Sequence, residues 1–378
     1  MVSPGISVTK NRTSLPVCAV LLAGGRGTRF WPRSRMRAPK QLLNITGKQS
    51  MLRQTVSRLE PLISLRNFWV VTNVEQSAAV RRQLQGVPAA HILAEPIGRN
   101  TAAAIGLAAI HLIYAHGDAL MAVLPSDSHV ADGARYRSLA RAAVDLARTP
   151  GNLVVFGIPP TRPETGYGYI EAGHRGARTR VAAAYPVRHF TEKPAFHVAR
   201  RYLASGNYYW NAGLFFWRAS TYLENLGRFL PATHSALSEL AKTIGTRRYG
   251  STLRRIYSGL ENISVDYAIM EPAAHDRRNP SVYVIPAKVG WSDIGSWQAV
   301  FDLLAAKPGA NVSASPLFAL DSTGNYFWSP KKFIAAIGVN DLVLVETEDA
   351  ILICPRDRSQ DVGKIVKWLE QRKLHKLI

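Results

Sequence analysis

Short apolar runs alternate with amphipathic stretches through the first half of the chain. The runs are rich in β-branched residues, which predicts buried strands at 17–23, 67–73, 91–96, 119–127 and 152–158. Helical spacing of apolar residues between the strands predicts helices at about 50–62, 75–85, 101–115 and 133–148. This alternation predicts an α/β fold whose mostly parallel sheet is covered on both faces. Ligands in such folds bind beyond the carboxyl ends of the strands.

The pattern changes in the second half of the chain. Aromatic and glycine-bearing segments between residues 161 and 305 predict antiparallel strands and loops that form a lid over the same sheet edge, with a helix at 194–206. After Pro308, short strands at 316–320, 325–329, 333–339, 342–347 and 350–355 precede a predicted helix at about 358–373. The expected organisation is a flexible leader at 1–14, a catalytic domain at 15–308 and a small β region at 309–378.

Composition narrows the class of protein. Of the 378 residues, 47% are hydrophobic and 19% are charged, as in an ordinary globular protein. Apolar runs fall short of the roughly 20 residues that span a bilayer, so we expect no membrane partner. The leader also lacks the apolar centre of a secretory signal. Cys18 and Cys354 lie in apolar strand-like runs, which favours buried free thiols and a cytoplasmic location.

The chain is strongly basic, with 47 Lys and Arg against 26 Asp and Glu and a net charge of +21. Most of the arginines are scattered, and the sequence carries neither a zinc-finger spacing nor an aromatic RNA-binding motif. We therefore expect no nucleic-acid partner. A separate cluster of cations follows the first predicted strand, and we assign it to catalysis: Arg26, Arg29, Arg33, Arg35, Arg37 and Lys40.

A glycine-rich loop, AGGRGTR at residues 23–29, follows that strand. A Walker-A loop requires a lysine directly after its last glycine, where this chain has Thr28. A dinucleotide fingerprint requires a third glycine, where this chain has Phe30. A basic surface turn is one remaining interpretation. The favoured one is an anion cradle, in which backbone amides approach a phosphate and cations supply charge: Gly24, Gly25, Gly27, Arg29 and Lys40.

A second turn, EPIGRNTAAAIG at residues 95–106, leads into a helix. Asn100 or Thr101 is expected at the helix N-cap, and an ordinary cap is the simplest interpretation. Beside the glycine loop, Glu95 and Asn100 would instead contact a base. An acidic side chain that accepts hydrogen bonds from both N1–H and N2–H of a base favours guanine.

Two aspartates end predicted apolar segments or lie in tight loops. Asp127 follows a strand and a proline, and Asp293 lies in the glycine-bounded stretch VGWSDIGSW. Each alone is typical of a turn or cap. Together they would supply two hard oxygen ligands for Mg²⁺, with nucleotide phosphates as further ligands.

Three polar residues in the second half suit a sugar phosphate. Glu192 and Lys193 are adjacent in FTEKP, where a surface ion pair is the alternative. In the functional interpretation Glu192 accepts from sugar hydroxyls and Lys193 holds an anomeric phosphate. Asn211, in the aromatic stretch NYYWNAGLFFW, has an amide that donates and accepts toward neighbouring hydroxyls.

Taken in order, these motifs resemble those of the mannose-1-phosphate guanylyltransferases, which belong to the sugar-phosphate nucleotidyltransferases. The resemblance covers roughly residues 15–305, and the tail from residue 311 is similar to the family's short left-handed β-helix. It rests on LLAGGRGTRFWPRSRMRAPKQ, EPIGRNTAAAIG, LPSD, GYGYIE, FTEKP, WNAGLFFW, SVDYAIME and GWSDIGSW. The fold implied is a Rossmann-like catalytic domain with a mixed, mostly parallel sheet, followed by a small β-helix-like region.

The resemblance implies a reaction in which GTP and mannose 1-phosphate give GDP-mannose and pyrophosphate, with Mg²⁺ as cofactor. It implies catalytic roles for Arg29, Lys40, Asp127 and Asp293, with both aspartates on the metal. The implied nucleotide site is Ala23, Gly24, Gly25, Gly27, Thr28, Arg29, Lys40, Glu95, Asn100 and Thr101. The implied sugar-phosphate site is Gly168, Glu192, Lys193 and Asn211.

Other functions stay open at this point. A nucleotidyltransferase for another sugar 1-phosphate, of the heptose or glucose type and using GTP or UTP, would carry the same motifs. A regulatory homologue that only binds sugar nucleotides is disfavoured because both Asp127 and Asp293 are present. A dinucleotide-dependent oxidoreductase is disfavoured by Phe30 and the arginine-rich loop. The β region is a candidate homodimer contact, and we expect no room for the isomerase domain of longer, bifunctional relatives.

Overall fold

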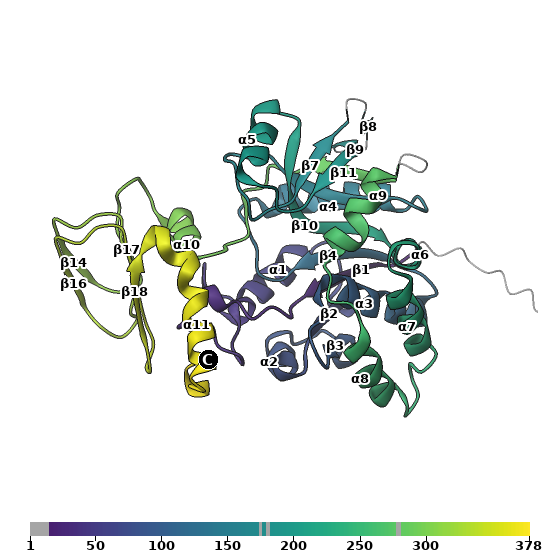
Figure 1. Ribbon diagram of the computed structural model, residues 1–378, viewed down its shortest axis with the longest axis horizontal. Helices are drawn as coiled ribbons and strands as arrows, with labels where there is room; N and C mark the ends of the chain where they lie inside the picture. The colour runs from purple at the N-terminus through teal and green to yellow at the C-terminus, as the bar shows by residue number, and fades with distance from the viewer. Residues whose placement is uncertain (1–14, 174–175, 179–181, 277–280) are drawn as a thin grey trace, which may run out of the picture.

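The computed structural model describes residues 15–173, 176–178, 182–276 and 281–378. The predicted leader at 1–14 lies outside these ranges. A large mixed sheet with helices on both faces forms most of the molecule, and a small group of strands stands beside it, joined by α10 (Trp297–Leu304) and α11 (Val362–Gln371) (Figure 1). None of the helices in the described ranges is long and apolar enough to cross a membrane.

The first half of the chain builds the parallel part of the sheet, as predicted. Strands β3 (Ile92–Glu95), β2 (Phe68–Asn73), β1 (Val17–Leu22) and β4 (Leu120–Pro125) pair in that order and in parallel. The connecting helices are α1 (Met51–Leu59), α2 (Val74–Gln83), α3 (Asn100–His116) and α4 (Gly133–Ala147). The predicted strand and helix ranges differ from these bounds by a few residues at most.

Both faces of β1 are buried, because its side chains alternate between two apolar layers. Cys18 and Val20 pack with α3, whereas Ala19 and Leu21 pack with α1 and α4. A strand of this kind has no polar face, which explains why its sequence is continuously apolar rather than alternating.

The predicted lid is wrong in one respect, because the strands of the second half extend the main sheet. After β4 the sheet continues through β10 (Tyr208–Arg218), β6 (Leu153–Ile158), β11 (Val282–Pro286), β9 (Ala183–Thr191) and β7 (Tyr169–Ala172). The expected antiparallel pairing is present, since β10 is antiparallel to both β4 and β6. Register shifts between Asn211 and Phe215, where Gly213 has a positive φ of 66°. The predicted helix at 194–206 is α5 (Phe196–Ser205).

Four helices between β10 and β11 were not predicted. They are α6 (Ala219–Phe229), α7 (Pro231–Ala241), α8 (Tyr249–Gly259) and α9 (Glu271–His275). They share one apolar layer with α3, and the buried Tyr222 hydroxyl donates to the Ala102 carbonyl oxygen at 2.8 Å. Helices α6 and α7 lie directly against α3, which is itself apolar on almost every side, whereas α8 packs on α7 and α9 on β9.

The C-terminal region pairs its strands mostly in parallel. Strands β13 (Val312–Ser313), β15 (Tyr326–Trp328) and β17 (Leu342–Glu346) form one ladder, and β14 (Leu317–Leu320) pairs with β16 (Ile334–Ile337). Strand β18 (Ile351–Pro355) is antiparallel to β17. Successive strands that alternate between two parallel sheets form the coils of a short β-helix, as the sequence predicted.

A third apolar layer joins this region to the catalytic part of the chain. Phe30 and Trp31, which follow the glycine loop, are buried with Trp297 of α10 and with side chains of β17 and α11. Because three distant segments supply this layer, neither part of the chain buries the apolar side chains of this layer without the other.

Candidate active site

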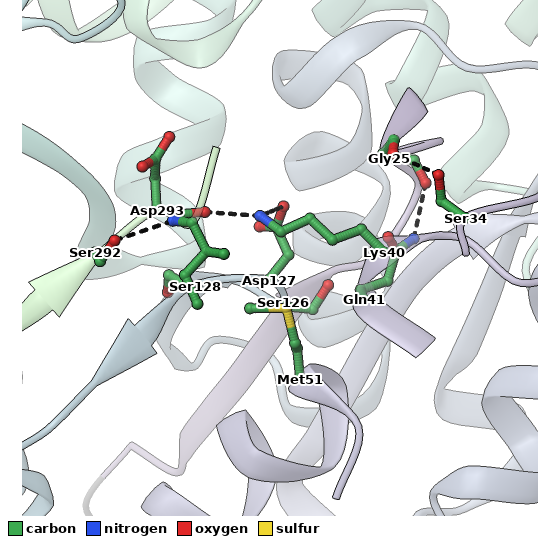
Figure 2. A network of polar contacts seen from close by, with 12 residues as sticks. Gly25, Ser34, Lys40, Gln41, Met51, Ser126, Asp127, Ser128, Ser292 and Asp293 are labelled. Atoms are coloured by element: carbon green, nitrogen blue, oxygen red, sulfur yellow. Dashed lines mark hydrogen bonds and ion pairs between the residues drawn. The ribbon is translucent and has the colours of Figure 1, made fainter. Parts of the chain in front are cut away.

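The glycine loop between β1 and Lys40 is shaped by the residues beneath it. Gly27 has a φ of 61°, and a β-carbon there would clash with Lys40 Cβ and lie 2.9 Å from its backbone nitrogen. The buried Gln41 side chain donates to the Ala23 and Gly25 carbonyl oxygens at 3.0 and 2.9 Å. The loop therefore turns its carbonyls inward at these two positions, and Figure 2 shows the contact between Gln41 and Gly25.

Lys40 lies at the centre of the predicted catalytic group. It is 4% exposed, and its Nζ donates to Asp127 Oδ2 at 2.9 Å and to the Asp293 carbonyl oxygen at 2.7 Å (Figure 2). One ammonium group therefore ties the loop after β1 to two loops that are far away in sequence. This contact brings together three of the four residues predicted to be catalytic.

A small ladder sets the two aspartates side by side. Strand β5 (His129–Val130) begins just after Asp127, and β12 (Trp291–Ser292) ends just before Asp293. The two strands are antiparallel, so their adjoining loops meet at one point of the sheet edge. This pairing was not visible from the sequence, because each strand is only two residues long.

The Asp293 carboxylate points away from Lys40 (Figure 2). Its Oδ1 accepts a hydrogen bond of 2.6 Å from the Tyr167 hydroxyl. Burial, and then the negative charge of Asp293, raise the pKa of Tyr167 well above its usual range. Tyr167 therefore stays a donor at neutral pH and fixes the direction of this carboxylate.

A pocket of about 250 Å³ joins the phosphate side to the predicted sugar side. Gly168 leaves space for the Glu192 carboxylate in this pocket, because a β-carbon at residue 168 would clash with Glu192 Oε2. The Lys193 Nζ lies 3.1 Å from Glu192 Oε1. The predicted site residues that line this pocket are Arg29, Lys40, Asp127, Gly168, Glu192, Lys193, Asn211 and Asp293.

Asp266 is a site residue that sequence reasoning missed. It lies in a single turn of π-helix, Asp266–Met270, and its Oδ1 accepts a 2.6 Å hydrogen bond from Asn211 Nδ2. The Asn211 Oδ1 in turn accepts from the Gly213 amide at 2.9 Å, so both ends of this side chain are held. The signal was present in the motif SVDYAIME, in which Asp266 is the charged residue before an apolar run.

The two acidic groups beside the sugar side, Glu192 and Asp266, both have raised pKa values. Burial raises the pKa of Glu192 to about 7, the negative charge of Asp266 adds to the effect, and Lys193 opposes it. Burial likewise raises the pKa of Asp266. The Glu192 Oε2 has no hydrogen-bond partner within the described residues, which leaves it free for a ligand hydroxyl.

The predicted base-binding residues lie beside the glycine loop rather than in the pocket. Glu95, at the end of β3, is 5% exposed, and a β-carbon on Gly24 would lie 3.5 Å from its Oε2. Burial raises the pKa of Glu95 to about 8, although a hydrogen bond from Tyr257 lowers it. The predicted residues outside the pocket lining are Ala23, Gly24, Gly25, Gly27, Thr28, Glu95, Asn100 and Thr101.

The predicted N-cap at the start of α3 is wrong. Asn100 is the first helical residue, with a φ of 63°, and its Oδ1 accepts from the adjacent Thr101 amide at 2.9 Å. The Thr101 hydroxyl accepts from the Val265 amide at 2.8 Å, so it is committed to a neighbouring segment. Arg99, which precedes the helix, makes no side-chain cap, and the Ala102 amide instead donates to the Ile263 carbonyl oxygen at 3.3 Å.

The assignment of the whole basic cluster to catalysis is also wrong. Most of its arginines attach the C-terminal region instead. Arg26 pairs with Glu370 and Arg35 with Asp349, each at 2.6 Å. The Arg33 guanidinium stacks on Trp328 at 4.0 Å from the ring centre. Within this cluster, only Arg29 and Lys40 line the central pocket.

The described residues contain no group of three or more His, Cys, Asp or Glu side chains that could hold a metal ion. Asp127 and Asp293 nevertheless line one pocket. The Asp127 side chain is 43% exposed, so its carboxylate is open to a ligand. Two carboxylates suit a magnesium ion that takes its other ligands from a phosphate group and water.

Comparison with known proteins agrees with the predicted family. Residues 18–308 match the nucleotidyl transferase family, and residues 317–369 match the MannoseP isomerase/GMP-like beta-helix domain. A mannose-1-phosphate guanylyltransferase of Salmonella muenchen is 39% identical over 93% of this chain and 73% of its own length.

Two further relatives match over most of the chain. The xanthan biosynthesis protein XanB of Xanthomonas campestris is 40% identical over 94% of this chain and 73% of its own length. A crystal structure from Thermus thermophilus, described as a mannose-1-phosphate geranyltransferase, is 33% identical, with a TM-score of 0.83 over 94% of this chain and 100% of its own. The chain therefore belongs to the nucleotidyl transferase family, in the group of the mannose-1-phosphate guanylyltransferases.

Proposed function

We propose that the chain transfers a guanylyl group from GTP to α-D-mannose 1-phosphate, forming GDP-mannose and pyrophosphate. The names of its relatives support this choice of substrates. The observation that carries the proposal is the contact of Lys40 with Asp127 and Asp293, at one end of a pocket whose other residues include Glu192 and Lys193. Such a pocket suits a ligand with phosphates at one end and hydroxyl groups at the other.

The reaction needs alignment and charge neutralisation more than proton transfer. An oxygen of the sugar phosphate is already anionic, so it attacks the α-phosphorus without a general base. As the new P–O bond forms, the bond to the bridging oxygen of the β-phosphate breaks, and pyrophosphate leaves with that electron pair. Arg29 and Lys40 are the pocket's cations on this side and would neutralise the crowded phosphates.

At the other end of the pocket, Glu192 has a pKa of about 7, so its carboxyl group is protonated in part of the molecules. It can therefore donate to or accept from a sugar hydroxyl. Lys193, half-exposed at the pocket, would bind the sugar's phosphate. Asn211 is held by Asp266 and would present its amide in a fixed direction. With the roles divided in this way, the proposed reaction needs no covalent nucleophile from the protein.

Mg²⁺ is part of the proposal. Asp127 and Asp293 would hold it, and oxygens of the nucleotide phosphates would supply further ligands. When bound, the ion would neutralise phosphate charge and polarise the group under attack.

Assembly and location stay predictions. The free thiols Cys18 and Cys354 suit a cytoplasmic enzyme. A homodimer would use the C-terminal β region, whose outer apolar side chains are roughly half-exposed or more: Phe318, Leu320, Ile337, Ile351 and Ile353.

Pyrophosphate release from a matrix of GTP, ATP, UTP and dTTP against mannose, glucose and heptose 1-phosphates tests the proposal. We expect fast release only with GTP, mannose 1-phosphate and Mg²⁺ together. Equal turnover with UTP or with glucose 1-phosphate would show that the alternative, a transferase for another sugar, is correct.

The metal assignment is tested in the same assay. Asp127→Asn and Asp293→Asn should each lower turnover by about 100-fold or more, because each replaces a negatively charged ligand of the proposed Mg²⁺ by a neutral one. Asp145→Asn, on the exposed side of α4, is the matched control and should keep full activity. Normal Mg²⁺-dependent rates in both site variants would refute the assignment.

A further inference from the structure

The segment that carries the glycine loop is held from outside by the end of the chain. Arg26 pairs with Glu370 of α11, and Trp31 Nε1 donates to the Leu377 carbonyl oxygen at 2.8 Å. Arg35 contacts both Asp349 and the Leu377 carbonyl. The nucleotide loop and the C-terminal region thus meet along several residues, although more than 300 positions separate them in sequence.

One of these contacts reaches the active-site pocket itself. Arg29 Nη1 donates a hydrogen bond of 2.7 Å to Gln360 Oε1. A β-carbon on Gly363, at the start of α11, would lie 3.5 Å from Thr28 Oγ1 and 3.7 Å from Arg29 Cγ. The C-terminal region therefore packs on the aliphatic part of the Arg29 side chain and also accepts a hydrogen bond from its guanidinium group.

Gln360 is itself firmly placed. It lies in the 3-10 helix Arg356–Asp361, in which Ser359 is 1% exposed. The Ser359 hydroxyl accepts from the Gln298 amide of α10 at 3.1 Å. The short helix is thus fixed to α10, which begins shortly after Asp293, so Gln360 sits on a rigid support close to the metal-binding loop.

The chemistry of this partner suits an arginine that must bind phosphate. Arg29 and Asp293 both lie beside Gly295, where a β-carbon would be 3.4 Å from Arg29 Nη1 and 2.8 Å from Asp293 Oδ2. A free guanidinium so placed would turn to that carboxylate and form an ion pair, in which the carboxylate offsets its positive charge. A neutral amide oxygen orients the guanidinium without cancelling its charge, and leaves its other N–H groups for a phosphate.

We propose that Gln360 is a positioning residue for Arg29, and that the C-terminal β region is for this reason a working part of the nucleotide site. The inference rests on the proposed function, in which Arg29 binds the triphosphate of GTP. Gln360 touches neither substrate. It acts by keeping Arg29 directed to the pocket and away from Asp293.

The test replaces Gln360 by methionine, which keeps the length of the side chain and removes the acceptor. We expect kcat/KM for GTP to fall about tenfold, the usual scale for a hydrogen bond to a charged group, while KM for mannose 1-phosphate is unchanged. Gln360 is exposed, so the melting temperature should also be unchanged. Gln371→Met, at the exposed end of α11, is the matched control and should behave as the parent protein.

A double-mutant cycle separates this role from a merely structural one. In an Arg29→Ala background, Gln360→Met should cause no further loss, because the residue that it positions is gone. A full tenfold loss in that background, or no loss in the parent, would overturn the inference. A parent protein that forms no GDP-mannose would instead refute the proposed function, so the two failures are distinguishable.

Discussion

At the residue scale, the buried carboxyl group of Glu95 makes stability depend on pH. Its pKa is raised from 4.5 to about 8, so the folded state binds this proton more tightly than the unfolded state does. The stabilisation is complete below pH 4.5 and is lost as the pH rises through 8. Glu192, whose pKa is raised to about 7, acts in the same direction.

We therefore predict that, without ligands, Glu95→Gln removes part of the fall in melting temperature between about pH 5 and pH 8. Differential scanning fluorimetry across this range measures the effect. Glu75→Gln, on the exposed side of α2, should leave the pH profile of the parent unchanged. A Glu95→Gln profile parallel to that of the parent would contradict the prediction.

The sequence was informative about which residues carry chemistry and less so about what they contact. Lys40, Asp127 and Asp293 were each predicted from local signals, and the structure brings them together. The role of Arg26 was misjudged because its partner, Glu370, is 344 positions away. A charged residue can be recognised in a sequence, whereas its partner depends on the fold. Gln360 was not predicted for the same reason, because its contact with Arg29 joins positions 331 residues apart.

At the element scale, the turn after β1 depends on Gly27. We predict that Gly27→Ala costs about 1–3 kcal/mol for the left-handed backbone alone and also displaces Lys40. The melting temperature and kcat should both fall, as measured by thermal unfolding and by GTP-dependent pyrophosphate release. Gly25→Ala is the comparison, because a β-carbon there meets nothing within 4 Å and the melting temperature should be kept. Equal melting temperatures for the two variants would refute this account.

Local periodicity predicted the elements of the first half well, because strands β1, β2 and β3, which follow one another along the chain, also pair with one another in the sheet, and β4 pairs with β1. It could not predict that β10 enters the sheet between β4 and β6, since strand order is decided by tertiary pairing. The helices α6 to α8 were missed for a related reason. Their apolar residues pack on α3, and the aromatic side chains around them suggested strands.

At the scale of the whole molecule, the apolar layer shared by Phe30, Trp297 and α11 couples the two parts of the chain. We predict one cooperative thermal transition, in which the calorimetric and van't Hoff enthalpies agree. Neither part can unfold alone without exposing the aromatic residues of this layer. Two transitions well separated in temperature in a calorimetric scan of the full chain would contradict the prediction.

The same arrangement has a consequence for how the enzyme is made. A ribosome produces the glycine loop more than 300 residues before Gln360, Glu370 and Leu377, which hold it. Until then Phe30 and Trp31 have no complete apolar layer to enter, and contacts between segments so far apart in sequence are slow to form. Nascent chains should therefore gain affinity for GTP only after the segment around residues 360–377 has been made, so the glycine loop is synthesised before the other site residues but becomes competent after them.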